Sequence, residues 1–122
     1  MSATAPSVWP DWIDVCAVDD ITPDTGVAVL IGDTQIAVVR VHVGDGDDQI
    51  FAVGNYDPFS RAFVIARGIV GDRGGVPKIA SPIFKQSFDL SNGQCLDDAN
   101  VRIPSYPTRV QDGRVAVCIA TD

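Results

Sequence analysis

Side chains that commonly do chemistry are few in this 122-residue chain, and they stand far apart. His42 is the only histidine, so any role as a general base would fall to it alone. Its place in a strand-forming run, far from any cysteine, favours an exposed strand histidine. The cysteines Cys16, Cys95 and Cys118 lack Cys-x-x-Cys spacing. Cys16 and Cys118 lie in apolar runs typical of packing, and nothing near Cys95 would activate it, although its place after a turn favours greater exposure.

Hydroxyl and carboxylate groups also form no recognisable catalytic set. Ser60 and Ser81 have no histidine near them and no Gly-x-Ser-x-Gly elbow, which argues against a serine hydrolase. The run from Gly44 to Asp48 predicts a turn, but it lacks the spacing and the final Glu of an EF-hand. We expect the paired acidic residues to be solvated in turns: Asp19-Asp20, Asp47-Asp48 and Asp97-Asp98.

Composition and charge narrow the class of protein. Apolar residues make up 46% of the chain and charged residues 20%, which predicts a folded domain rather than a disordered chain. The net charge of −7, with nine scattered Lys and Arg residues, argues against a nucleic-acid partner. No apolar run is long enough to cross a bilayer, and the first residues lack the features of a signal peptide. The odd, scattered cysteines fit a reducing cytoplasmic location best.

Short strands that alternate with tight turns predict an almost all-β domain. Gly32-Asp33, Ser91-Asn92-Gly93 and Asp112-Gly113 each separate two strand-forming runs, which is the pattern of a β-hairpin. Between Gln35 and Val43, alternate side chains form two faces of an expected strand. No segment keeps a 3.6-residue period beyond about two turns. The glycine-rich residues 68–77 are predicted to form a mobile surface loop.

Two further segments combine a proline with phenylalanines in a short loop motif. The first reads Asn55-Tyr56-Asp57-Pro58-Phe59-Ser60-Arg61, and the second reads Ser81-Pro82-Ile83-Phe84-Lys85-Gln86 and leads to Phe88-Asp89-Leu90. They resemble the two loops of Rieske proteins that supply Cys-Pro-His and Cys-Pro-x-His-Gly. In that alignment Asp57 and Phe59 stand at the first Cys and His, and Ser81 and Phe84 at the second pair. Because a Rieske cluster needs two thiolates and two imidazoles, the resemblance implies the fold without its iron–sulfur chemistry.

The resemblance becomes more specific when the rest of the chain is included. The same loops, with Gly93-Gln94-Cys95-Leu96-Asp97-Asp98 and Trp12-Ile13-Asp14-Val15-Cys16, resemble the small subunits of assimilatory NAD(P)H-dependent nitrite reductases. This resemblance implies a Rieske-like antiparallel β-sandwich or barrel with very little helix. It also implies a disordered lead at 1–8 and one domain at 9–120, with an inserted tip unit at about 54–90.

The resemblance further implies a subunit that supports an enzyme. In that family nitrite is reduced to ammonium with electrons from NADH or NADPH, and FAD, siroheme and a [4Fe–4S] cluster belong to the large subunit. This chain would bind the large subunit while holding no metal, no cofactor and no catalytic residue of its own. Two alternatives stay open, a Rieske-type ferredoxin and a free-standing β-barrel that binds a small ligand. The single histidine argues against the ferredoxin, because the cluster needs two.

Loss of the cluster leaves two loops at the tip that need another source of cohesion. Phe59 and Phe84 are predicted to pack together there, because buried phenyl rings contribute a large apolar area. Pro58 and Pro82 are predicted to stiffen the loops by fixing one backbone torsion in each.

The tip is also the predicted contact with the large subunit, because Rieske tips are where electrons pass to a partner. Arg61, Ile83 and Lys85 are predicted to form an apolar centre with a charged rim, which is the usual anatomy of a protein interface.

Overall fold

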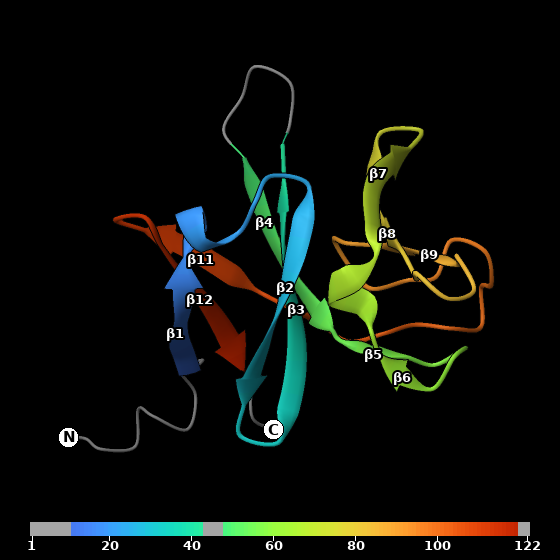
Figure 1. Ribbon diagram of the computed structural model, residues 1–122, viewed down its shortest axis with the longest axis horizontal. Coiled ribbons are helices and arrows are strands. Elements are labelled where there is room, and N and C mark those ends of the chain that lie inside the picture. The colour runs from blue at the N-terminus through green and yellow to red at the C-terminus, as the bar shows by residue number, and fades with distance from the viewer. Residues whose placement is uncertain (1–10, 43–47, 120–122) are drawn as a thin grey trace.

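The computed structural model describes residues 11–42 and 48–119, which form two lobes of β-sheet (Figure 1). The larger lobe lies at the left of the view and the smaller lobe at the right. The lead predicted at 1–8 and most of the turn predicted at 44–48 lie outside the described residues.

Two antiparallel sheets make up the larger lobe. One has the strand order β1–β12–β11 and the other the order β10–β4–β3–β2. The strands are β1 Asp11–Ala17, β2 Thr25–Ile31, β3 Thr34–Val41, β4 Gln49–Gly54, β10 Ser105–Tyr106, β11 Thr108–Gln111 and β12 Arg114–Ile119. This arrangement confirms the predicted antiparallel, nearly all-β fold.

The smaller lobe is inserted between β4 and β10 and holds the remaining two sheets. One sheet is β5–β6 and the other is β7–β8–β9. These strands are β5 Tyr56–Asp57, β6 Ala62–Phe63, β7 Ile69–Arg73, β8 Val76–Ala80 and β9 Ser87–Asp89. Their span falls inside the segment predicted to be inserted, and the following loop packs on the same lobe through Cys95 and Ile103.

Helix is almost absent from the described part of the chain. Two short 3₁₀ turns, η2 Val18–Asp20 and η3 Ile65–Arg67, are the helical elements there. None of the described helices has the length and apolar character needed to cross a membrane.

Strand β3 holds the two lobes together because both of its faces are buried. Ile36 and Val38 pack against Val115 and other residues between the two large sheets. The alternate residues Ala37 and Val39 pack on the opposite side, in the cluster that includes the core of the smaller lobe. The predicted alternation along this strand is therefore confirmed, with both faces in the core. Each fully buried Val or Ile contributes about 1.5–3 kcal/mol to folding.

The turns predicted from the sequence form at the expected residues, but one segment that was predicted to be a loop is a hairpin. Gly32-Asp33 connects β2 to β3, and Asp112-Gly113 connects β11 to β12. The turn at 91–93 joins β9 to Gln94, whose carbonyl accepts the Asp89 N–H at 2.8 Å. Residues 68–77 form most of the β7–β8 hairpin instead of a loop, because the two glycines at its turn adopt positive φ angles.

Substitution of two turn glycines tests this arrangement. Both Gly93 and Gly113 have positive φ, but a Cβ at Gly93 would lie 1.9 Å from the carbonyl oxygen of Ile103, whereas Gly113 has open space. We expect Gly113→Ala to lower the free energy of unfolding by about 1–2 kcal/mol through backbone strain. Gly93→Ala adds overpacking of about 1–3 kcal/mol or more. Urea denaturation of both variants measures the difference, and equal losses would contradict the described contact between Gly93 and Ile103.

Candidate functional site

The first tip loop is a tight turn whose opening side chain caps its own backbone. It connects β5 to β6, and the Arg61 N–H donates to the Asp57 carbonyl at 2.7 Å. The Oδ1 atom of Asp57 accepts the Phe59 N–H at 2.9 Å, which is the side-chain bond of an Asx-turn. Arg61 closes the turn at a φ of 59°.

The second tip loop repeats the same design with a serine in the opening position. The Lys85 N–H donates to the Ser81 carbonyl at 3.0 Å, and Lys85 has a φ of 65°. The Ser81 hydroxyl oxygen accepts the Ile83 N–H at 3.3 Å. Each loop therefore begins with a polar residue and a proline, and ends with a basic residue in the left-handed conformation.

A buried hydrogen bond joins the two loops. The Ser81 hydroxyl donates to Oδ2 of Asp57 at 2.5 Å, and both residues have no exposed surface. The Ser60 hydroxyl donates to the same oxygen at 2.8 Å. With the Phe59 N–H on Oδ1, the Asp57 carboxyl group accepts three hydrogen bonds, so its burial is compensated.

Polar contacts behind the loops fix where each loop starts and ends. Asn55, which is 2% exposed, accepts the Ala66 N–H through Oδ1 at 2.8 Å and donates to Gln35 Oε1 at 3.2 Å. On the other side, Oδ2 of Asp97 accepts the Ser87 N–H at 2.8 Å at the start of β9. The two loops are thus anchored to β3 and to the loop after β9.

Comparison with known proteins assigns the chain to a family. The sequence model of the Rieske-like [2Fe-2S] domain matches residues 11–118. The NADH nitrite reductase small subunit of Escherichia coli K12 is 43% identical over 104 residues, which cover 85% of this chain and 94% of that protein. This chain belongs to the nitrite reductase small-subunit family. The assignment confirms the resemblance drawn from the loop motifs.

A solved structure and a longer protein that contains a similar segment agree with this family assignment. The crystal structure of a protein provisionally assigned as the NADH-dependent nitrite reductase small subunit of Mycobacterium tuberculosis is 47% identical, with a TM-score of 0.85. The match covers 93% of this chain and 99% of that one. The nitrite reductase large subunit of Klebsiella oxytoca contains a segment 35% identical over 106 residues, which cover 87% of this chain and 11% of that protein.

The residues at the predicted Rieske ligand positions do not fit a [2Fe–2S] cluster. Phe59 and Phe84 have no lone pair to donate to iron, and Ser81 and Asp57 replace the thiolates. The Asp57 and Ser81 oxygens also lie 2.5 Å apart in a direct hydrogen bond, which leaves no space for iron between them. In the described part of the chain, no three His, Cys, Asp or Glu side chains are grouped to hold a metal ion.

The predicted pairing of Phe59 with Phe84 is wrong. Phe59 turns inward and packs on Phe88 of the core, with ring centroids 6.2 Å apart, whereas Phe84 is 58% exposed. The second ring lies in the exposed turn of its loop, next to Lys85. Cohesion between the loops comes from the bond between Asp57 and Ser81, which the sequence motifs did not reveal.

The three residues predicted to contact a partner are all exposed at the tip. Ile83 is 48% exposed, and Arg61 and Lys85 are exposed as well. The structure also exposes Tyr56 and Phe63, whose rings are 5.1 Å apart on the β5–β6 hairpin. The sequence offered a signal for this pair, because strand residues on one face of a hairpin lie opposite each other.

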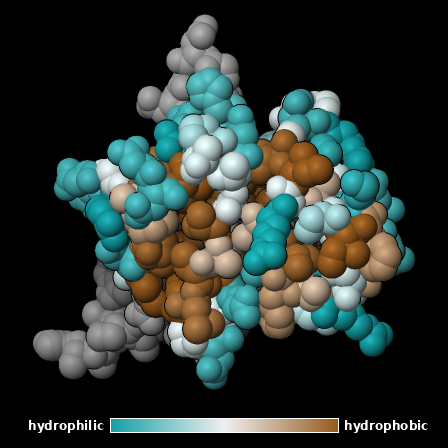
Figure 2. Space-filling model, in the orientation of Figure 1, coloured by the Kyte–Doolittle hydropathy of each residue, from teal (hydrophilic) through white to brown (hydrophobic). Residues whose placement is uncertain are grey.

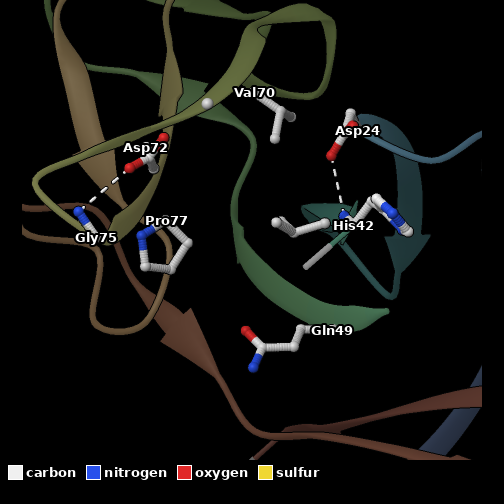
Figure 3. A pocket seen from close by; sticks show the side chains of 9 residues that line it. Asp24, His42, Gln49, Val70, Asp72, Gly75 and Pro77 are labelled. Atoms are coloured by element: carbon white, nitrogen blue, oxygen red, sulfur yellow. Dashed lines mark hydrogen bonds between the residues drawn. The ribbon is translucent and has the colours of Figure 1, made fainter. Parts of the chain in front are cut away.

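A separate cleft of about 570 Å³ has no residue of the two tip loops in its lining (Figure 3). Asp24 and His42 line one side of it and Asp72 and Pro77 the other. The two carboxylates that line it accept hydrogen bonds from backbone N–H groups. Asp24 accepts the His42 N–H at 3.0 Å, and Asp72 accepts the Gly75 N–H at 3.2 Å. His42 is exposed as predicted, and its Nδ1 contacts Asp48 Oδ1 at 2.8 Å. The lining shows no nucleophile poised beside a base.

The paired acidic residues take mainly structural roles. Asp48 and Asp97 are not merely solvated turn residues as predicted, because Asp48 also pairs with Arg40 at 2.6 Å, and Asp97 pairs with Arg73. Hydrogen bonds from His42 and then Arg40 lower the pKa of Asp48. Among the other paired acidic residues, Asp19 and Asp20 are exposed and Asp98 is partly exposed, while Asp47 lies outside the described residues.

The cysteines resemble packing residues more than nucleophiles. Cys95 and Cys118 are each 3% exposed, so the expectation of a more exposed Cys95 is wrong. Its side chain joins the core of the smaller lobe, because the bridge from Phe88 to Cys95 turns it inward. Burial raises the pKa of the Cys16 thiol, which disfavours the reactive thiolate.

A double-mutant cycle measures the bond that joins the loops. We expect Asp57→Ala to lower the free energy of unfolding by about 3 kcal/mol, because it leaves buried donors without an acceptor. Ser81→Ala should cost about 1–2 kcal/mol, and the two changes should couple by about 1–2 kcal/mol in urea denaturation.

The chain offers a matched control for this cycle. Ser91 donates to Asp89 at 2.6 Å in an exposed turn, so Ser91→Ala should change stability by less than about 0.5 kcal/mol. Additive effects of Asp57→Ala and Ser81→Ala would show that the buried bond contributes nothing to cohesion.

Acid should weaken the anchor behind the second loop. The Ser87 N–H, and then Arg73, hold the pKa of Asp97 below its ordinary value. A carboxyl group with a lowered folded pKa stabilises the protein above its unfolded pKa of about 3.9, and the contribution disappears as pH falls through the folded pKa. We therefore expect Asp97→Asn to be less stable than the parent chain at pH 7, with a smaller difference at pH 3. Thermal unfolding at both pH values checks this, and a constant difference would contradict the assignment.

Proposed function

We propose that this chain is the cluster-free small subunit of an assimilatory nitrite reductase. It binds a large subunit that carries FAD, siroheme and a [4Fe–4S] cluster and reduces nitrite to ammonium with electrons from NADH or NADPH. The chain supplies no catalytic residue and no cofactor, and it works in the cytoplasm. Its tip, including Arg61, Ile83 and Lys85, contacts the large subunit.

The observation that carries this proposal is the closed tip. Asp57 and Ser81, which stand at the positions predicted for the Rieske thiolates, bond directly to each other. A group that passes electrons needs a redox centre, and these side chains cannot hold the one typical of the fold. The tip is therefore suited to protein contact and not to electron transfer.

The fused relative supports a large-subunit partner. A segment similar to most of this chain lies within the Klebsiella oxytoca large subunit, so in that protein the domain and the reductase are one polypeptide. Fusion keeps a binding domain at a high effective concentration next to its site. A separate chain needs a stable interface for the same result, typically about 800 Å² from each partner.

The two alternative functions have less support. A ferredoxin would need cluster ligands, and the tip residues do not supply them. A small-ligand binding module has one observation in its favour, the cleft beside His42, which is within the usual size range for ligands. Its carboxylates are engaged with backbone N–H groups, so they offer little to orient a ligand.

Co-expression with the large subunit tests the proposal. We expect the two chains to co-purify, and we expect nitrite-dependent oxidation of NADH or NADPH to be higher with the small subunit than without it. Purified alone, the small subunit should lack stoichiometric iron and the visible absorption of a [2Fe–2S] centre.

The outcomes separate the candidate functions. Failure to co-purify, together with equal activity of the large subunit with and without this chain, would contradict the proposed function. Stoichiometric iron in the isolated small subunit would favour the ferredoxin instead.

A further inference from the structure

We propose that the tip binds a site on the large subunit that is apolar at its centre and acidic around its rim. The inference rests on the proposed function and specifies the chemistry of the partner's surface. We define the tip surface as the exposed side chains of the two loops and the β5–β6 hairpin: Tyr56, Arg61, Phe63, Ile83, Phe84 and Lys85.

The tip surface carries most of the exposed large hydrophobic side chains. Of the large hydrophobic side chains that are exposed in the described part of the chain, four belong to it: Tyr56 at 41%, Phe63 at 54%, Ile83 at 48% and Phe84 at 58%. Exposed apolar groups that gather on one site mark an interaction surface more often than scattered ones. Aromatic side chains are also the residues that dominate binding energy at protein interfaces.

The charge of the tip surface is opposite to that of the whole protein. Residues 49–71 and 77–88 contain one acidic side chain, Asp57, whose carboxyl group is buried and accepts three hydrogen bonds. The exposed charges of the two loops are Arg61 and Lys85, both basic, on a chain of net charge −7. A complementary partner surface therefore carries carboxylates around an apolar patch.

The backbone of the tip is already ordered for binding. Each loop is closed by a hydrogen bond between its first and last residues, at 2.7 Å in the first loop and 3.0 Å in the second. The buried bond from Ser81 to Asp57 fixes one loop against the other. A surface that is rigid before binding loses less conformational entropy when the complex forms.

A second apolar surface lies over β1 and β2 on the larger lobe (Figure 2). Leu30 on β2, which lies outside the tip surface, is the most exposed large hydrophobic residue in the described part of the chain, at 69%. The charges nearest in sequence on these strands are mainly acidic, and Arg114 is paired with Asp14 at 2.8 Å. This surface would suit a basic partner, so the two surfaces predict opposite effects of added charge on binding.

Charge reversal tests the inference on the intact two-subunit complex. The tip variant is Arg61→Glu with Lys85→Glu, and Arg109→Glu with Arg114→Glu makes the same change in net charge on β11 and β12. Binding of each chain to the purified large subunit is measured by calorimetry at low and high salt. We expect the tip variant to bind roughly tenfold more weakly or worse at about 0.05 M salt, and we expect this difference to shrink at about 0.5 M salt, where the charges are screened.

Neutral substitutions separate the loss of an attractive charge from the repulsion that a new Glu side chain adds, and they disturb folding less. Arg61→Gln with Lys85→Gln should weaken binding in the same direction but less, with unfolding temperature close to that of the parent chain. Phe63→Ser with Phe84→Ser should weaken binding at both salt concentrations, whereas Leu30→Ser should leave it unchanged.

The results that overturn the inference differ from those that overturn the proposed function. Equal effects of the tip and control charge reversals would reject the acidic-rimmed site, and so would a tip variant that binds like the parent chain. In either case, complex formation by the parent chain would still uphold the proposed function. Loss of binding in Leu30→Ser, with normal binding by the tip variants, would move the contact to the larger lobe at β2. Failure of the parent chain itself to bind the large subunit would reject both.

Discussion

The hydrogen bond between the Ser81 hydroxyl and the Asp57 carboxylate joins the two tip loops at the positions predicted, from the Rieske motif, for two cluster ligands. Hydrogen bonds to a carboxylate are shorter and stronger than those between neutral groups, and burial strengthens them further. Asp57 gathers three donors, so the first loop is organised around its side chain and the second loop joins it through Ser81. The side chains at the two predicted thiolate positions thus hold the two loops together.

The rest of the fold supports this bond by fixing the two loops in position. Strand β3 packs in the core of the larger lobe through one face and in the cluster of the smaller lobe through the other, and its neighbour β4 does the same through Ala52 and Val53. Asn55 connects the first loop to Gln35 on β3, and Asp97 holds the start of β9 after the second loop. Since the core of the smaller lobe lies directly below the loops, their exposed side chains are presented on a rigid base. This is the arrangement expected of a subunit whose role is to bind another protein.

Sequence patterns predicted the strands well and the tip contacts poorly, and the reasons are physical. Turn residues such as Gly32-Asp33 act locally, so the hairpins were predictable. Gly74-Gly75 carries the same signal, but the glycine-rich context of 68–77 hid it. The bond from Ser81 to Asp57 joins residues far apart in sequence, and its existence depends on how the two loops meet. Whether Phe59 or Phe84 enters the core depends on how each loop folds over the smaller lobe, and side-chain type alone does not determine that.

Native-state hydrogen exchange tests most directly whether this bond holds the two loops as one unit. The amides of Arg61 and Lys85 close the first and second loops, and both are hydrogen-bonded although their side chains are exposed. In the isolated protein, without any metal, both amides should be protected, and Ser81→Ala should reduce protection in both loops together. Rapid exchange of either amide in the parent chain, or loss of protection confined to the second loop in Ser81→Ala, would contradict this account.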